Sequence, residues 1–263
     1  MNTDGSDGSD GRSEYASLPR PPLTTRFPDV PRADAATALV SSWIVPEPAF
    51  QRPAADAILG EWERQSRPEA MLSLSVFLSA DGGHLLNYGQ WTSDDAHREW
   101  VRARRPAVVG RIDTALPGIR RPGLVRYRRY RSYVPPAPAG GHRPTLLVTP
   151  AFATAGPDAQ RALADTVVAG LTADQVPGLL GAHLHLSQDG DRVLTYAEWA
   201  DLAAWREFAA GGASARLREA IEALDSVTPT PVVPGGPEVA HYRLYKSLAN
   251  VPSPEATTPP QGV

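Results

Sequence analysis

Hydrophobic and polar positions along the chain predict a short series of strands and helices. Strict alternation over residues 72–79, LSLSVFLS, predicts a strand, and residues 84–91, HLLNYGQW, predict the strand that returns after a four-residue turn. Apolar residues at helical spacing over about residues 50–65 predict a helix before this hairpin. β-rich runs at residues 38–45 and 124–134 predict the first and last strands of the series.

A second helix is expected directly after the hairpin. Thr92-Ser93-Asp94-Asp95 supplies a capping residue and acids for a first turn, and the following segment carries Ala96, His97 and Trp100. The second half of the chain predicts the same order, with an added helical segment before its last strand. Its expected elements are a strand at residues 145–152, a helix near 157–172, a hairpin at 179–187 and 192–199, a helix with Trp205 and Phe208, the added segment at 214–224 and a strand at 241–248.

Residues 79–91 and 187–199 show that this similarity is a duplication. Identical residues recur 108 positions apart, as in Asp81 and Asp189, Tyr88 and Tyr196, and Trp91 and Trp199. The predicted fold class is therefore α+β, with two tandem ferredoxin-like (βαββαβ) modules packed sheet to sheet as a pseudo-dimeric α+β barrel. Because helices cover one face of each sheet, the second copy can cover the other. Differences between the copies indicate where function lies.

Composition shifts give the expected boundaries. The Asp-, Gly-, Ser- and Pro-rich residues 1–35 and 250–263 predict disordered tails. Module one is expected at residues 36–134, a proline-rich linker at 135–143 and module two at 144–249.

Charge and cysteine content exclude several functions. The net charge of −3 does not favour polyanion binding, and the absence of cysteine excludes thiolate catalysis, disulfides and Cys-ligated metal. Because the chain shows neither a long apolar run nor a secretory leader, we expect a cytoplasmic protein without a membrane span.

Two clusters of polar residues have alternative interpretations. His183 and His185 face the same way on one strand, but no third ligand has a matching spacing, so contacts between the modules explain them better than a metal does. The arginines and tyrosines of residues 126–133 resemble a nucleic-acid surface, yet polar residues on both faces of a strand favour a solvated edge or a seam between the modules. Their guanidinium groups could also hold an anionic substrate or a flavin phosphate.

The element order and the duplicated turn-strand-Trp segment resemble the antibiotic biosynthesis monooxygenase family of dimeric α+β barrels, over about residues 36–249. In the family's anthrone oxygenases, an Asn and a Trp four residues apart on the third strand line the pocket. Asn87 and Trp91 match that spacing, whereas module two has Thr195 in place of the Asn. The family pocket also uses a Tyr soon after the Trp and an Arg further on; His97 lies near the first position, and Arg111 is the candidate for the second.

Pairing across the turn predicts which side chains share a face. If Ser79 pairs with His84, then Val76 faces Asn87 and Leu72 faces Trp91, on the side that the helices cover. A three-residue loop would instead place Asn87 beside Ser75. We prefer the first register, because Trp91 and the aliphatic row both favour burial. The further candidates for substrate-lining residues are Trp43, Val76, Trp100 and Tyr127.

The resemblance implies an oxygenase of aromatic polyketide biosynthesis that uses O₂ to oxidise a polycyclic phenol or anthrone, or to open a ring. Asn87 and Trp91 would bind the oxygen anion and the rings, His97 would transfer a proton, and Arg111 would stabilise charge. The family implies neither metal nor haem, and either no cofactor or reduced flavin (FMNH₂ or FADH₂) from a reductase. A non-catalytic pocket protein or a cyclase-like protein for the same intermediates is the alternative, and a homodimer remains open.

Overall fold

The structure, a computed structural model, describes residues 23–64, 67–136 and 143–249, apart from the side chains of residues 104–108. Both expected tails fall largely outside this part, as do residues 137–142 of the expected linker. Module one consists of β1 (Thr37–Ile44), the short 3-10 helix η1 (Pro48–Phe50), α1 (Gln51–Arg64), β2 (Met71–Ser79), β3 (His84–Trp91), α2 (Asp94–Ala115) and β4 (Arg120–Tyr133).

Module two repeats this order and adds a helix and a short strand. It consists of β5 (Leu146–Thr154), α3 (Pro157–Asp174), β6 (Leu179–Ser187), β7 (Arg192–Trp199), α4 (Leu202–Ala210), α5 (Gly212–Glu222), β8 (Val227–Pro229) and β9 (Val239–Ala249). The predicted βαββαβ order is confirmed in both modules, and α5 occupies the predicted helical segment. The caps follow the sequence: the Ser93 side chain accepts a hydrogen bond from the backbone of Ala96, and Asp201 does the same for Ala204.

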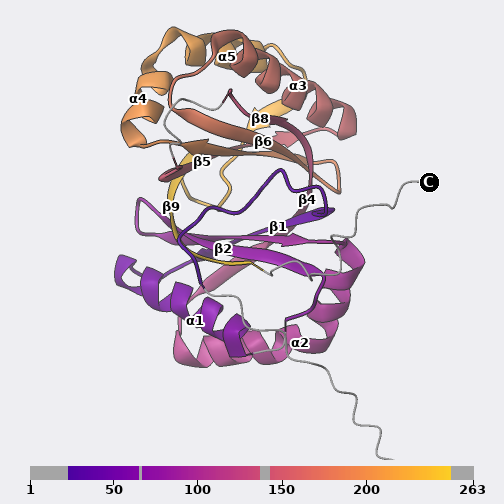
Figure 1. The fold of residues 1–263 in the computed structure, drawn as a ribbon, viewed down its shortest axis with the longest axis vertical. Helices are drawn as coiled ribbons and strands as arrows, with labels where there is room; N and C mark the ends of the chain where they lie inside the picture. The colour runs from indigo at the N-terminus through magenta and orange to yellow at the C-terminus, as the bar shows by residue number, and fades with distance from the viewer. Residues whose placement is uncertain (1–22, 65–66, 137–142, 250–263) are drawn as a thin grey trace, which may run out of the picture.

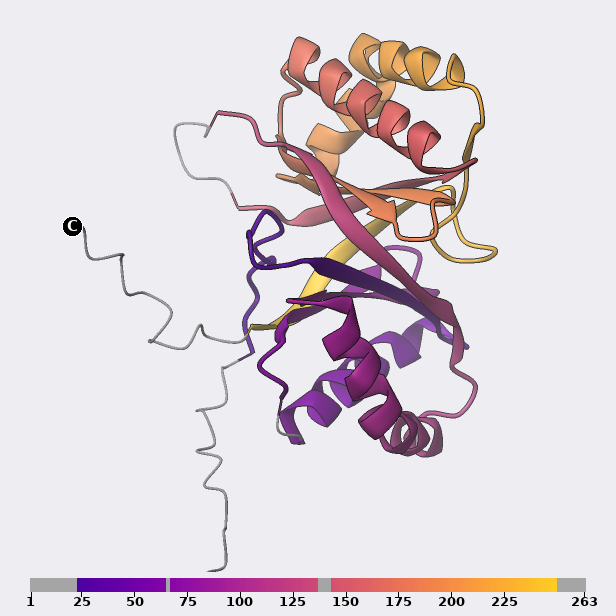
Figure 2. The same ribbon diagram turned by 90° about the vertical axis from the view of Figure 1, so that its right-hand side faces the viewer.

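The two modules share one continuous sheet. Its strand order is β7-β6-β4-β1-β3-β2-β9-β5-β8, and an additional pairing of β7 with β5 closes it into a barrel. The long strand β4 pairs with β1 of its own module and with β6 of the other, while β9 pairs with both β5 and β2. Figures 1 and 2 show the helices as outer layers at opposite ends of the molecule, with the strands between them. The arginine- and tyrosine-rich strand is therefore a seam between modules.

The faces of the sheet turned away from the helices enclose a common core. Phe77, Tyr88, Leu147, Tyr196 and Tyr242 are at most 1% exposed there, and they come from both modules. This confirms that each copy covers the open face of the other. Burial of these side chains is the main force joining the modules, because apolar area removed from water stabilises by about 25 cal/mol per Å².

Residues 23–35 cover one end of this inter-sheet core. Thr24 exchanges backbone hydrogen bonds with Ser247 of β9, at 2.9 and 2.8 Å. Phe27 packs on Phe77 with 5.5 Å between ring centroids, and Val30 is 2% exposed. The expectation of a disordered tail through residue 35 is therefore wrong for residues 23–35, which lie against the barrel with Val30 buried and Phe27 half-buried.

A buried polar network crosses the same core. The Tyr88 hydroxyl lies 3.0 Å from His185 Nε2, a contact between the modules as the sequence suggested. Burial lowers the pKa of His183 to about 3 and that of His185 to about 4, so both rings are neutral near pH 7. Burial, with a smaller contribution from Asp29, raises the pKa of Glu198 to about 7.

Glu198 makes a testable contribution to pH-dependent stability. Its pKa is above the ordinary 4.5, so the folded chain holds this proton more tightly than the unfolded chain, and stability falls as the pH rises from about 4.5 to 7. Module one has Gln90 at the equivalent position. We expect the stability advantage of Glu198→Gln over wild type to grow by about 2 kcal/mol between pH 5 and pH 8. Urea unfolding at both pH values measures it, and an advantage independent of pH would contradict the assignment.

Candidate functional site

Strand β3 presents three residues to the layer of helices above it. Leu78 pairs with Leu85 and Val76 with Asn87, which confirms the preferred register. Trp91 pairs with Met71 instead of Leu72, because a bulge between Met71 and Ser73 shifts the register by one residue. Alternation along β3 then places Asn87, Gly89 and Trp91 on the same face, toward α1 and α2.

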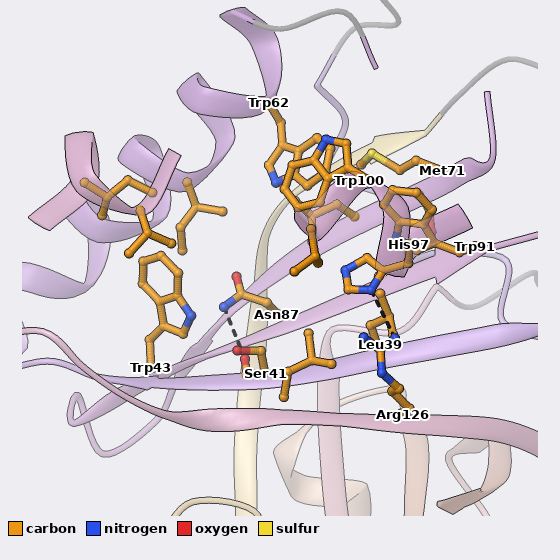
Figure 3. A pocket seen from close by; sticks show the side chains of 18 residues that line it. Leu39, Ser41, Trp43, Trp62, Met71, Asn87, Trp91, His97, Trp100 and Arg126 are labelled. Carbon is orange, nitrogen blue, oxygen red and sulfur yellow. Dashed lines mark hydrogen bonds between the residues drawn. The ribbon is translucent and has the colours of Figure 1, made fainter. Parts of the chain in front are cut away.

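A cavity of about 350 Å³ lies between this face of the sheet and the two helices of module one. Four tryptophans line it: Trp43 from β1, Trp62 from α1, Trp91 from β3 and Trp100 from α2 (Figure 3). Trp62 and Trp100 stack with 4.5 Å between centroids, and Trp91 meets Trp62 edge to face at 6.4 Å. Leu124, which also lines the cavity, is 39% exposed and marks its opening to solvent. Such walls suit a flat aromatic ligand.

Asn87 supplies a hydrogen-bond acceptor to the cavity. Its Nδ2 donates to the backbone oxygen of Ser41 at 3.1 Å, across the pairing of β1 with β3. This contact orients the amide, because the backbone oxygen can only accept. Asn87 Oδ1 has no hydrogen-bond partner among the described residues, although the side chain is only 8% exposed. Burying an unpaired carbonyl oxygen costs about 1–3 kcal/mol, which a ligand hydroxyl would offset.

A cluster of polar side chains from the start of α2 and from β4 lies at the same cavity. Arg126 Nη1 bonds the carboxylate of Asp94 and lies 3.1 Å from His97 Nδ1 (Figure 3). Asp94 also accepts from Arg98 Nε at 2.7 Å. Burial opposes ionisation of Asp94, but the bonds from Arg98 and Arg126 hold its pKa below the ordinary value. The carboxylate therefore stays ionised and fixes the guanidinium against the imidazole.

The Arg126 contact determines the tautomer of His97. A guanidinium has only donors, so His97 Nδ1 must accept, and the proton of the neutral ring resides on Nε2. His97 is 5% exposed and packs edge to face on Trp91 with centroids 4.9 Å apart. An imidazole in this state donates through Nε2, whereas the sequence analysis expected a base.

The structure brings together five of the residues proposed from sequence. Asn87, Trp91 and His97, as well as Trp43 and Trp100, all line the cavity. Trp91 is 2% exposed, so it is at once part of the hydrophobic core and part of the cavity wall.

Three proposed residues lie elsewhere. Arg111 is on the outside of α2, 52% exposed, with its Nε 2.8 Å from Glu61 of α1, because Val109 and Ile112 occupy the positions that face the cavity. Val76 faces Asn87 but is fully buried in the core and does not line the cavity. Tyr127 points into the inter-sheet core, since it follows Arg126 on β4 and successive strand residues face opposite sides.

Sequence analysis missed Arg126, Trp62 and Gly89 as cavity residues. Arg126 was assigned to the seam, and Trp62 to the apolar face of its helix. Comparison of the two copies could have identified two of these residues, because the copies differ at both positions. Arg126 corresponds to His241, and Gly89 corresponds to Ala197.

Module two has a smaller and almost entirely apolar cavity. Its volume is about 90 Å³, and Thr195, Trp199 and Trp205 occupy the places of Asn87, Trp91 and His97. Met71 and Trp100 correspond to Leu179 and Phe208, which also line it. Leu171 takes the place of Trp62, because α3 follows α1 at an offset of 109, as the matching contacts of Gln51 with Ser79 and of Gln160 with Ser187 show. The copies thus differ at most of the residues that make the first cavity large and polar.

In the part of the chain that the structure describes, histidine and carboxylate side chains do not gather in groups of three or more that could hold a metal ion. Across the described ranges, each helix is too short or too polar to cross a lipid bilayer.

Residues 148–220 match the family model of antibiotic biosynthesis monooxygenases. This part of the chain is therefore similar to an antibiotic biosynthesis monooxygenase domain. This match lies in module two, and the larger cavity lies in module one, the other copy of the duplication. No curated protein matches the chain.

Several solved structures share the fold of this chain. An anthrone oxidase-like protein is 18% identical with a TM-score of 0.61, over 87% of this chain and 96% of that one. A putative monooxygenase from Lactobacillus acidophilus is 7% identical with a TM-score of 0.52, over 81% and 96%. A Streptomyces coelicolor monooxygenase in complex with nanaomycin D is 31% identical, covering 42% of this chain and 94% of that one, with a TM-score of 0.34. The first two likenesses show the fold.

Proposed function

We propose that this protein is an oxygenase of aromatic polyketide metabolism that oxidises a polycyclic phenol or anthrone with O₂ in the module-one cavity. The observation that carries the proposal is a cavity walled by four tryptophans. It also holds the pair of His97 and Arg126, and Asn87 Oδ1, which has no hydrogen-bond partner within the described part of the chain. The monooxygenase domain match and the fold shared with an anthrone oxidase-like protein support the same activity.

The polar groups would orient the substrate. Asn87 Oδ1 accepts a hydrogen bond from a substrate hydroxyl, while the imidazole of His97, held by Arg126, lines the cavity beside the oxygen on which negative charge develops. Arg126, fixed by Asp94, places a positive charge behind the imidazole, and this charge favours loss of the substrate proton to solvent at the opening beside Leu124. Preorganised donors aimed at a developing oxyanion commonly contribute about 3–4 kcal/mol each.

The reaction balances without an external reductant. Proton loss from the CH₂ carbon of an anthrone gives an enolate, which passes one electron to O₂. The substrate radical and superoxide then form a carbon–oxygen bond, and the resulting peroxide anion takes a proton. Loss of water, which carries away the outer oxygen and the remaining carbon-bound hydrogen, leaves the second carbonyl of a quinone. One oxygen atom of O₂ enters the product and the other leaves in water.

A resident flavin does not fit the cavity well. A flavin phosphate needs cations or a cluster of backbone N–H groups. Among the described side chains that line the cavity, Arg126 is the single cation, and its Nη1 already serves Asp94 and His97. We therefore derive no step through a flavin.

Oxygen uptake with an anthrone tests the proposal and the flavin alternative together. We expect the purified protein to consume one O₂ per anthrone and to yield the quinone without added flavin, because the substrate supplies all the electrons. A matched assay contains a flavin reductase, FMN and NADH. Because reduced FMN itself consumes O₂, the quinone is the readout in that assay. Quinone formed only there would favour the flavin-dependent reaction, and ligand binding without quinone in either assay would favour the non-catalytic alternative.

A further inference from the structure

Trp43 forms one end of the module-one cavity and stands apart from the other three tryptophans. Trp62, Trp91 and Trp100 pack on one another, with ring centroids 4.5, 6.1 and 6.4 Å apart. Figure 3 shows Trp43 on the other side of Asn87 from this cluster. Among the described residues, the contact recorded for the Trp43 ring is with a cation and not with another ring.

The guanidinium of Arg121 lies on the face of the Trp43 indole. Its Cζ is 4.2 Å from the ring centroid, within the range of a cation–π interaction. Arg121 Nη1 also donates to the Asp113 carboxylate of α2. The Arg121 side chain is 14% exposed, and its Nε and Nη2 are buried without a hydrogen-bond partner among the described residues. Because little water competes for the guanidinium, its attraction to the indole is stronger than at an exposed site.

A bulge in β4 aims Arg121 at Trp43. The pairing of β1 with β4 shifts register beside Trp43, so that two residues of β4, Arg121 and Pro122, stand opposite it. Pro122 has no N–H for the ladder, and Gly123 has a φ of +150°, which favours glycine. Bulges bend a strand and redirect its side chains, often next to active sites. The sequence Arg-Pro-Gly therefore places a cation behind this wall of the cavity.

Module two has neither the indole nor the cation at this place. Phe152 corresponds to Trp43 by strand pairing, and it lies beside Pro229 of the short strand β8. β9 begins only at Val239, so the bulged segment that carries Arg121 in β4 has no strand counterpart. The module-two cavity is also the smaller, about 90 Å³ against about 350 Å³. The arginine behind the wall thus accompanies the large cavity.

We propose that Arg121 is a positioning residue that holds Trp43 as the end wall of the cavity, and that it thereby selects flat ligands of three or more fused rings. Arg121 lies outside the cavity lining, so it acts through the indole and not by touching the ligand. Asn87 and the cluster of three tryptophans hold a two-ring ligand, whereas a third ring extends to Trp43. The class of ligand rests on the proposed function.

Equilibrium binding of a dihydroxyanthraquinone and of a hydroxynaphthoquinone tests this role without turnover. We expect Arg121→Met, which keeps the length of the side chain, to weaken binding of the three-ring quinone about 10-fold, because the freed indole is no longer preorganised. The two-ring quinone should bind within about 2-fold of wild type, because it does not depend on Trp43. Arg121→Lys keeps a cation at the ring and should recover most of the loss.

Trp43→Leu shows whether Arg121 acts through the indole. In that background Arg121→Met should change binding of the three-ring quinone by less than about 2-fold, since no ring remains to be held. Arg120→Met removes the same charge from the exposed neighbouring residue, and this control should bind as wild type does. Asp113→Asn removes the anchor of the guanidinium at a side chain that is 51% exposed. It should weaken binding of the three-ring quinone about 3-fold.

Melting temperatures within about 4 °C of wild type check that the variants fold. If Arg121→Met does not fold, Asp113→Asn decides the question by the same comparison of the two quinones. Equal losses for both quinones, an undiminished effect of Arg121→Met beside Trp43→Leu, or a wild-type chain that does not bind the three-ring quinone overturns the role of Arg121. Binding of that quinone by a chain that forms no quinone from an anthrone overturns only the proposed function.

Discussion

Arg126→Gln is expected to lower kcat/KM for oxygen-dependent turnover by about 100-fold, because without Arg126 the imidazole of His97 is no longer preorganised toward the developing oxyanion. The substitution removes the charge that lies 3.1 Å from His97 Nδ1 and releases the imidazole from its fixed tautomer. Because negative charge on the substrate is greatest in the transition state, most of the loss should fall on kcat and little on KM. Initial rates of oxygen uptake over a range of substrate concentrations measure both constants.

Arg128→Gln is the matched control for this prediction. Arg128 lies two residues further along β4, and its side chain is exposed. Both variants lose one positive charge from the same strand, so a general electrostatic effect on substrate approach would lower both rates equally. A loss confined to Arg126→Gln supports the role of the His97 pair, and equal losses in the two variants would contradict it.

Phe77→Ala is expected to lower the free energy of unfolding by about 3–5 kcal/mol, as for other large aromatic side chains deleted from a core. Phe77 is fully buried between the sheets and meets Phe27 and Tyr196 with centroids 5.5 and 6.1 Å away. Since β4 and β9 hydrogen-bond across the modules, both should unfold in one transition in wild type and variant. Urea unfolding followed by tryptophan fluorescence and circular dichroism measures this.

Tryptophan fluorescence reports the unfolding of both modules. Trp91 belongs to module one and Trp199 to module two, each in the core beneath its own helices. Val134→Ala, at a side chain that is 59% exposed, should change stability by no more than about 0.5 kcal/mol. Two separate transitions in either protein would show that the modules fold independently, against the closed barrel.

The candidate site could be predicted where the local sequence pattern determines which way a side chain points. Strand alternation and a four-residue turn placed Asn87 opposite Val76, and the cap at Ser93 placed His97 in the first turns of α2. Arg111 could not be placed in this way. The helix α2 is long and contacts α1, the sheet and solvent, so a small rotation about its axis changes which residues a side chain meets. In this structure the guanidinium of Arg111 forms an ion pair with Glu61.

The amino-acid sequence by itself determined the duplication, the βαββαβ order of each half and the hairpin that carries Asn87 and Trp91, because these follow from periodicity and turn chemistry within about 10–20 residues. Only the tertiary structure decided that β4 and β9 cross between the modules, that Arg126 meets His97 and Asp94, and that Arg121 lies on the ring of Trp43. Each of these depends on residues far apart in the chain, whose approach is set by closure of the whole barrel and the packing of helices on it.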